Sequence, residues 1–161
     1  MKIVKEDVKK INVDYFDPLL QNFSYLKSQG EQYRLLVYLT NLYNGITIID
    51  AGTAQGHSCL SLSQNKNNKI ITYDLVRNPN LCDLDSIPNV ERKLLDINKE
   101  TDEIIKSAKI ILLDIDPHDG KQEHVFYEKL KAMNYKGYVI VDDTKLNQPM
   151  IDFWNSVTHE K

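Results

Sequence analysis

Compact apolar runs and helix-forming segments alternate along most of the chain. Apolar residues at helical spacing predict helices over residues 15–29 and 31–44. Beyond residue 45 the apolar positions gather into short runs rich in Ile, Val and Leu, which are separated by loops and amphipathic segments. These patterns predict strands at 46–49, 69–73, 90–95, 110–115 and 138–141, and helices at 57–65, 99–107, 121–133 and 149–157.

The predicted strands lack the alternation of apolar and polar residues that a sheet with one solvent-exposed face shows. This indicates a parallel sheet that is covered on both faces. We therefore expect an α/β protein with a Rossmann-like open parallel sheet and helices on both faces. No linker or low-complexity tract interrupts residues 1–161, which predicts a single domain with a helical N-terminal part (1–44) and an α/β core (45–161).

The composition and charge of the chain indicate which classes of binding partner to expect. Hydrophobic residues make up 42% and charged residues 27% of the 161 residues, which are ordinary values for a folded globular protein. The net charge is −3 and the sequence has no basic stripe, so nucleic acid is not an expected partner. No apolar run approaches the ~18 residues of a membrane-spanning helix. Cys59 and Cys82 show no zinc-binding pattern and no leader-like segment precedes them, which predicts reduced thiols and a cytoplasmic location.

An aspartate follows each predicted strand. These residues are Asp50, Asp74, Asp96, Asp116 and the pair Asp142-Asp143. In an open parallel sheet the carboxyl ends of the strands share one edge, where ligands bind. Neighbouring carboxylates repel one another, so such a set favours a bound cation or a ligand with hydroxyl or amino groups. The alternative is that each aspartate only caps the helix or turn behind it.

The loop after the first predicted strand reads DAGTAQGHS over residues 50–58. Its glycines, Gly52 and Gly56, allow a tight turn and a close approach of a ligand to the backbone. The Gly-x-x-x-Gly spacing is neither a dinucleotide-binding fingerprint nor a P-loop. Asp74 stands 24 positions after Asp50 at the end of the next strand, where a carboxylate can accept hydrogen bonds from both hydroxyls of a ribose.

Five segments together resemble a known family: IIDAGTAQGHS, KIITYD, LLDI, DIDPHDG and GYVIVDD. They are similar to class I S-adenosylmethionine-dependent methyltransferases, and more narrowly to the cation-dependent O-methyltransferases of catechols, caffeoyl-coenzyme A and bacterial small molecules. The resemblance implies S-adenosylmethionine as cofactor and a sheet in the order 3-2-1-4-5 that lacks the last two family strands. The cofactor-binding residues that it implies are Asp50, Gly52, Thr53, Gly56, Ser58, Asp74 at the ribose and Asp96 at the adenine.

The resemblance also implies a metal site formed by Asp116, Asp142 and Asp143. The family places an aspartate after strand four and a ligand pair 26 and 27 positions later, and this spacing favours Asp116 over Asp114. Oxygen ligands suit Mg²⁺, Ca²⁺ or Mn²⁺ rather than zinc. Such a cation would lower the pKa of a substrate hydroxyl and orient it toward the sulfonium methyl group.

The catalytic candidates are His118 and Asp116. Catechol-type enzymes carry a lysine as general base three positions after the first metal aspartate, and here that position is Asp119. His118 beside it is the candidate base, since imidazole titrates near neutral pH. The alternative for His118 is an ordinary loop histidine that bonds to backbone or water.

Only 18 residues follow Asp143, so nothing in the pattern covers the outer edge of the fifth strand. An open edge invites pairing, which predicts a homodimer or a partner chain. The first functional hypothesis is an O-methyltransferase that acts on a small hydroxylated substrate with S-adenosylmethionine and Mg²⁺ or a similar cation. The second is a catalytically silent subunit of the same fold that binds the cofactor or a protein. The third, a flavodoxin-like phosphate-binding protein, is disfavoured because carboxylates repel phosphate.

Overall fold

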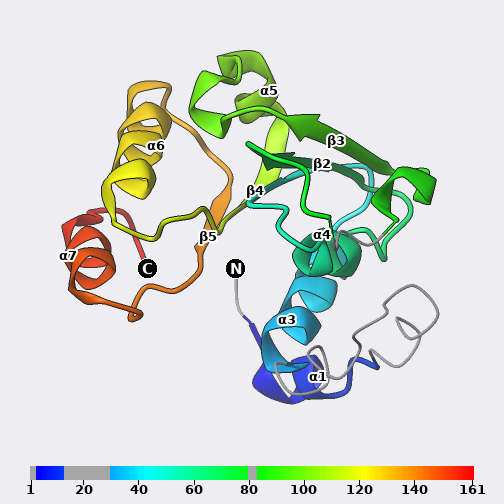
Figure 1. The fold of residues 1–161 in the computed structure, drawn as a ribbon. Helices are drawn as coiled ribbons and strands as arrows, with labels where there is room; N and C mark the ends of the chain where they lie inside the picture. The colour runs from blue at the N-terminus through cyan, green and yellow to red at the C-terminus, as the bar shows by residue number, and fades with distance from the viewer. Residues whose placement is uncertain (1–2, 13–29, 80–82) are drawn as a thin grey trace.

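The computed structural model describes residues 3–12, 30–79 and 83–161, and its strands form one sheet (Figure 1). The strand order is β3-β2-β1-β4-β5, and every neighbouring pair is parallel. The strands are β1 (Thr47–Ala51), β2 (Lys69–Asp74), β3 (Val90–Leu94), β4 (Ala108–Leu113) and β5 (Tyr138–Val141). The predicted fold class and strand order are therefore confirmed.

Helices cover both faces of the sheet (Figure 1). Helices α3 and α4 pack on one face, α5 and α6 pack on the other, and α7 lies against α6. The helices are α1 (Lys5–Lys9), α3 (Gly30–Asn41), α4 (His57–Leu62), α5 (Asp102–Ser107), α6 (Lys121–Ala132) and α7 (Gln148–Ser156). The helix expected over 15–29 lies outside the described residues. None of the described helices is long and apolar enough to cross a membrane.

Successive residues of the central strands are buried on opposite faces of the sheet. Ile48 and Ile110 belong to the core under α3 and α4, whereas Ile49 and Ile111 belong to the core under α5 and α6. All four side chains are completely buried. Because neighbouring strand residues point to opposite faces, a sheet covered on both sides requires the uninterrupted apolar runs seen in the sequence.

The strand ends differ slightly from the predicted ones. β2 ends on Asp74, but β1 continues through Asp50 because Ala51 still pairs with both neighbouring strands. The remaining aspartates follow the ends of β3, β4 and β5, in the order Asp96, Asp114, Asp116, Asp142 and Asp143. The parallel strands thus bring their aspartates to one edge of the sheet, as expected.

The two edge strands are less buried than the central ones. No residue of β3 is fully buried, and Leu94 at its end is exposed. β5 forms the opposite edge, and within the described ranges no strand pairs with its outer side. Pairing of this edge with a second copy or a partner chain stays a prediction. The connection from β2 to β3 contains a 3-10 turn, Leu84–Ser86, and no long helix in its described residues.

Candidate cofactor and metal site

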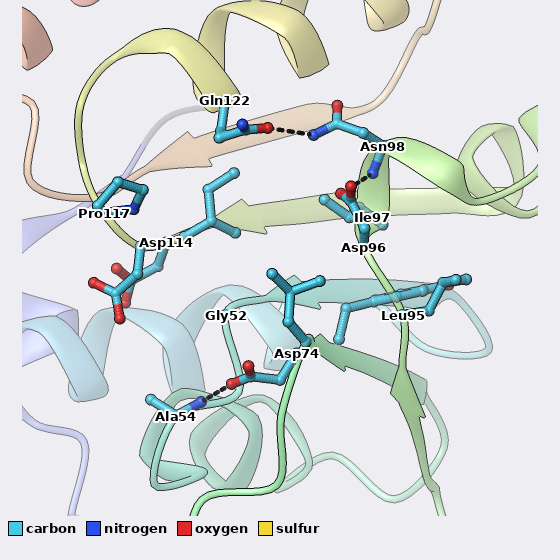
Figure 2. Close-up of a pocket in the computed structure, with 14 residues that line it drawn as sticks. Gly52, Ala54, Asp74, Leu95, Asp96, Ile97, Asn98, Asp114, Pro117 and Gln122 are labelled. Atoms are coloured by element: carbon cyan, nitrogen blue, oxygen red, sulfur yellow. Dashed lines mark hydrogen bonds between the residues drawn. The ribbon is translucent and has the colours of Figure 1, made fainter.

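A cavity of about 300 Å³ opens at the carboxyl ends of β1 to β4 (Figure 2). Its carboxylates are Asp74, Asp96, Asp114 and Asp116, and its apolar walls include Tyr73, Leu75, Leu95, Ile97 and Ile115. Among the predicted cofactor residues, Gly52, Asp74 and Asp96 line this cavity. The others, Asp50, Thr53, Gly56 and Ser58, are buried and are not among its lining residues. The cavity therefore combines apolar walls with carboxylate acceptor groups.

The loop between β1 and α4 is held against the end of β2. The N–H groups of Gly52 and Thr53 both donate to the carbonyl oxygen of Tyr73, at 3.0 and 2.9 Å. Gly52 and Gly56 have φ values of +107° and +87°, which L side chains rarely adopt. These two glycines allow the sharp turn that exposes the loop backbone to the cavity.

Asp74 is the last residue of β2 and Asp96 follows the end of β3, and both line the cavity (Figure 2). Oδ2 of Asp74 accepts a hydrogen bond from the Ala54 N–H at 2.9 Å, and its Oδ1 accepts one from the Val76 N–H at 3.2 Å. Oδ1 of Asp96 accepts one from the Asn98 N–H at 2.9 Å. A carboxylate oxygen has a second lone pair, so both residues can also accept hydrogen bonds from a ligand.

Asp50 is completely buried within β1. The Thr72 hydroxyl donates to its Oδ2 at 2.7 Å, and the hydroxyl oxygens of Thr53 and Thr72 lie 2.6 Å apart. Burial raises the pKa of Asp50 to about 6, while the hydroxyls of Thr72 and Ser58 lower it and the charge of Asp74 raises it. Asp50 therefore supports the loop from inside the sheet.

An imidazole and two carboxylates gather beside the cavity. Asp114, His118 and Asp143 each contribute one potential metal-ligand atom, and these atoms lie within 4.8 Å of one another. Nε2 of His118 is 3.8 Å from Oδ1 of Asp114 and 3.7 Å from Oδ2 of Asp143. Asp114 also lines the cavity, so the cluster and the cavity are contiguous.

The predicted ligands Asp116 and Asp142 lie at the border of this cluster. Oδ1 of Asp116 is 3.5 Å from Nε2 of His118, but the Asp116 side chain is 94% exposed. Oδ2 of Asp142 accepts a hydrogen bond from the Gln32 side chain on α3. The structure thus places Asp114, which directly follows β4, in the position where the sequence spacing favours Asp116.

The cluster holds closely spaced negative charge. Burial raises the pKa of Asp114 to about 7, the nearby charge of Asp142 raises it as well, and His118 lowers it. A divalent cation stabilises the ionised form of such carboxylates. Two carboxylates and an imidazole form a suitable donor set for one, so the cluster fits a divalent cation, although Asp143 is the one predicted ligand that belongs to it.

Glu123, the third residue of α6, is not among the residues that the sequence pattern indicates. This side chain is 1% exposed, and Oε1 lies 3.9 Å from Nδ1 of His118. An acidic residue in the first turn of a helix is common because it complements the helix dipole. No sequence signal therefore distinguishes Glu123 from an ordinary solvent-exposed glutamate.

No protein-family model and no curated protein matches the chain. Among solved structures, an S-adenosylmethionine-dependent O-methyltransferase from Thermotoga maritima matches 79% of this chain with 17% identity and a TM-score of 0.53. A methyltransferase of Podospora anserina, with S-adenosylhomocysteine bound, matches 70% with 13% identity and a TM-score of 0.50. The chain spans about half the length of each, 49% and 52% respectively. The likeness shows that this chain has the Rossmann-like α/β fold of S-adenosylmethionine-dependent methyltransferases.

Proposed function

We propose that the chain is an S-adenosylmethionine-dependent methyltransferase that methylates an oxygen of a small hydroxylated molecule with the help of a divalent cation. The observation that carries this proposal is the position of Asp114, which both lines the cavity and belongs to the cluster of potential metal ligands. A methyl donor in the cavity and an acceptor hydroxyl at the cluster would therefore meet.

The chemistry of the cavity suits this cofactor. The carboxylate of Asp74 is available to ribose hydroxyls and that of Asp96 to the amino group of adenine, while Leu95 and Ile97 offer apolar contact for the ring. The acidic walls complement the positive charge of a sulfonium ion and disfavour a phosphorylated ligand. The S-adenosylhomocysteine in the Podospora methyltransferase supports the same cofactor here.

The cluster suits activation of the acceptor. Asp114, His118 and Asp143 are the residues that would hold a divalent cation. Such a cation would lower the pKa of a hydroxyl bound beside it. Asp116, whose Oδ1 lies 3.5 Å from Nε2 of His118, would take the hydroxyl proton, or His118 would do so where its Nε2 does not bind the cation. With the cofactor bound, the acceptor oxygen would form a bond to the methyl carbon as the carbon–sulfur bond breaks, and the products would be a methyl ether and S-adenosylhomocysteine. Alignment of these atoms supplies most of the rate.

Calorimetric titration of the purified protein with S-adenosylhomocysteine, with and without Mg²⁺, tests the cofactor assignment. We expect a micromolar Kd, or about −8 kcal/mol. Transfer of a radiolabelled methyl group to catechols or sugars then tests the reaction. Cofactor binding without transfer to any acceptor would favour the alternative, a catalytically silent subunit of this fold. Absence of binding by a folded protein would contradict the proposal.

A further inference from the structure

Glu123 is a buried carboxylate without a hydrogen-bond partner. It is 1% exposed, and neither of its oxygens bonds to any described residue. Burial raises its pKa, although the N–H groups of Gly120 and of Glu123 itself lie near enough to lower it. An unpaired buried carboxylate is costly and is seldom kept without a role. The side chain lies beside His118, whose Nδ1 is the side-chain nitrogen that faces it.

His118 stands between Glu123 and the cluster. Its Nδ1 is 3.9 Å from Oε1 of Glu123, whereas its Nε2 faces Asp114 and Asp143 at 3.8 and 3.7 Å. The two ring nitrogens therefore point to opposite partners. The imidazole is only 17% exposed, so few other orientations are open to it.

The backbone around His118 is fixed by the neighbouring loop. The His118 N–H donates to the carbonyl oxygen of Ile115 at 3.3 Å, and its own carbonyl oxygen accepts a hydrogen bond from Nδ2 of Asn147 at 2.9 Å. Asn147 also caps α7, since its Oδ1 accepts from the Met150 N–H at 2.9 Å. The ring is thus presented to the cluster by a loop that Asn147, at the start of α7, holds in place.

We infer that His118 is a metal ligand through Nε2, together with Asp114 and Asp143, and that Glu123 orients it from behind as a positioning residue through Nδ1–H. This inference rests on the proposed divalent cation and defines its class. A carboxylate that accepts from the far nitrogen of a ligating histidine fixes its tautomer and increases its basicity. Imidazole is a preferred ligand of Zn²⁺, Co²⁺ and other transition ions and not of Mg²⁺ or Ca²⁺.

The expected metal is therefore a transition ion such as Fe²⁺, Co²⁺ or Zn²⁺ instead of the Mg²⁺ that an oxygen-only ligand set predicts, and Mn²⁺ serves as a paramagnetic probe of the same site. The assignment also distinguishes between the two candidate bases, His118 and Asp116. A histidine bound to a metal through Nε2 has no free lone pair at that atom, which leaves Asp116 to take the substrate proton. Its 94% exposed side chain is open to solvent, where the proton can leave.

The test is metal binding by the full chain without cofactor or substrate. Mn²⁺ is titrated in the presence of excess Mg²⁺, and pulsed electron paramagnetic resonance then detects coupling of bound Mn²⁺ to a ¹⁴N nucleus. We expect Mn²⁺ to bind against the excess Mg²⁺ and the ¹⁴N coupling to disappear in His118→Gln. The matched control is His124→Gln, because His124 is an exposed histidine on α6 and should not affect the signal.

The contribution of Glu123 is measured with Glu123→Gln, which keeps the shape of the side chain. We expect the affinity for Co²⁺ to fall roughly tenfold or more. The control is Glu128→Gln on the exposed side of the same helix, where Glu128 pairs with Lys131, and its affinity should equal that of the parent protein. Thermal melting of each variant separates a loss of ligand from a loss of fold.

The outcomes separate this inference from the proposed function. Mn²⁺ bound without ¹⁴N coupling and displaced by Mg²⁺ would mean an oxygen-only site, which overturns the inference and leaves the proposed function intact. Absence of any metal binding by a folded protein would overturn both the inference and the cation in the proposed function. The titration with S-adenosylhomocysteine tests the cofactor independently of both.

Discussion

The α-carbon of Gly52 lies directly against the backbone of Asp114. A Cβ placed on Gly52 would stand 1.5 Å from the carbonyl oxygen of Asp114, far closer than any two such atoms approach. The contact joins the loop after β1 to the end of β4, at the place where the cavity meets the acidic cluster. The cavity and the cluster of potential metal ligands are therefore held in register by main chain.

Gly52→Ala should break this contact. The added methyl group forces the two loops apart, and the residue also has to keep a φ of +107°. We expect the free energy of unfolding to fall by about 3 kcal/mol or more, and binding of S-adenosylhomocysteine to be lost. Urea denaturation measures the first effect and calorimetry the second.

Gly45→Ala is the matched control for that variant. Gly45 also has a positive φ, +70°, but a Cβ there would meet no atom within 4 Å. The change should therefore cost only the backbone strain, about 1 kcal/mol, and leave ligand binding unchanged. Equal stabilities of the two variants would contradict the close approach of Gly52 to Asp114.

Asp74→Ala tests the ribose contact of the proposed cofactor. The carboxylate bonds to the N–H groups of Ala54 and Val76, so its loss removes support for the loop as well as two acceptors. Hydrogen bonds to a charged group contribute about 1.5–3 kcal/mol, which predicts a roughly tenfold to hundredfold weaker affinity for S-adenosylhomocysteine. Asp85→Ala is the control, because Asp85 pairs with Arg92 outside the cavity. Unchanged affinity of Asp74→Ala would remove Asp74 from the site.

Asp50→Asn should stabilise the cofactor-free protein at neutral pH. The pKa of Asp50 is raised to about 6 in the folded state, so the folded protein favours the protonated carboxyl. Stability from this group is complete below the unfolded pKa of about 4 and is lost as the pH rises through about 6. The loss corresponds to at most about 3 kcal/mol at pH 7.

Asparagine keeps an acceptor for Thr72 and carries no charge, so the variant should escape this loss. We expect Asp50→Asn to unfold at a higher urea concentration than the parent at pH 7 and at a similar one at pH 4. A variant that is destabilised equally at both pH values would show that the charge of Asp50 is not the cause. The measurement uses protein without cofactor or metal, because a positive charge bound near the β1 loop would change the pKa of Asp50.

Sequence pattern is sufficient for the architecture because the central strands must be apolar on both faces. Ile48 and Ile49 point into different cores, and only an unbroken apolar run satisfies both. The same reasoning brings the aspartates to one edge. The composition of the site, however, depends on where each strand ends to within one or two residues. β4 ends at Leu113, which places Asp114 at the sheet edge and leaves Asp116 in the exposed loop beyond it.

Glu123 is a second feature of the site that the sequence pattern does not predict. Its burial depends on how the loop from residue 114 to 120 folds back over the start of α6, and that packing has no periodic signature. Gln32 is a similar case, since it reaches Asp142 from a helix 110 positions earlier in the chain. Such contacts between distant segments determine which carboxylates face the cluster and which are already bonded.

Asp142 and Asp143 should consequently respond differently to substitution, although they are adjacent. Oδ2 of Asp143 faces His118 in the cluster, whereas Oδ2 of Asp142 is already bonded to Gln32. A ligand at one hundred times its Kd raises stability by about 2.7 kcal/mol, so Mn²⁺ should raise the melting temperature of the parent protein. We expect Asp143→Asn to lose this increase and Asp142→Asn to retain most of it. Scanning calorimetry with and without Mn²⁺ measures both, and the opposite result would assign the ligand to Asp142, as the sequence spacing also allows. Because the two variants carry the same change in charge, a difference between them reports which carboxylate faces the ion.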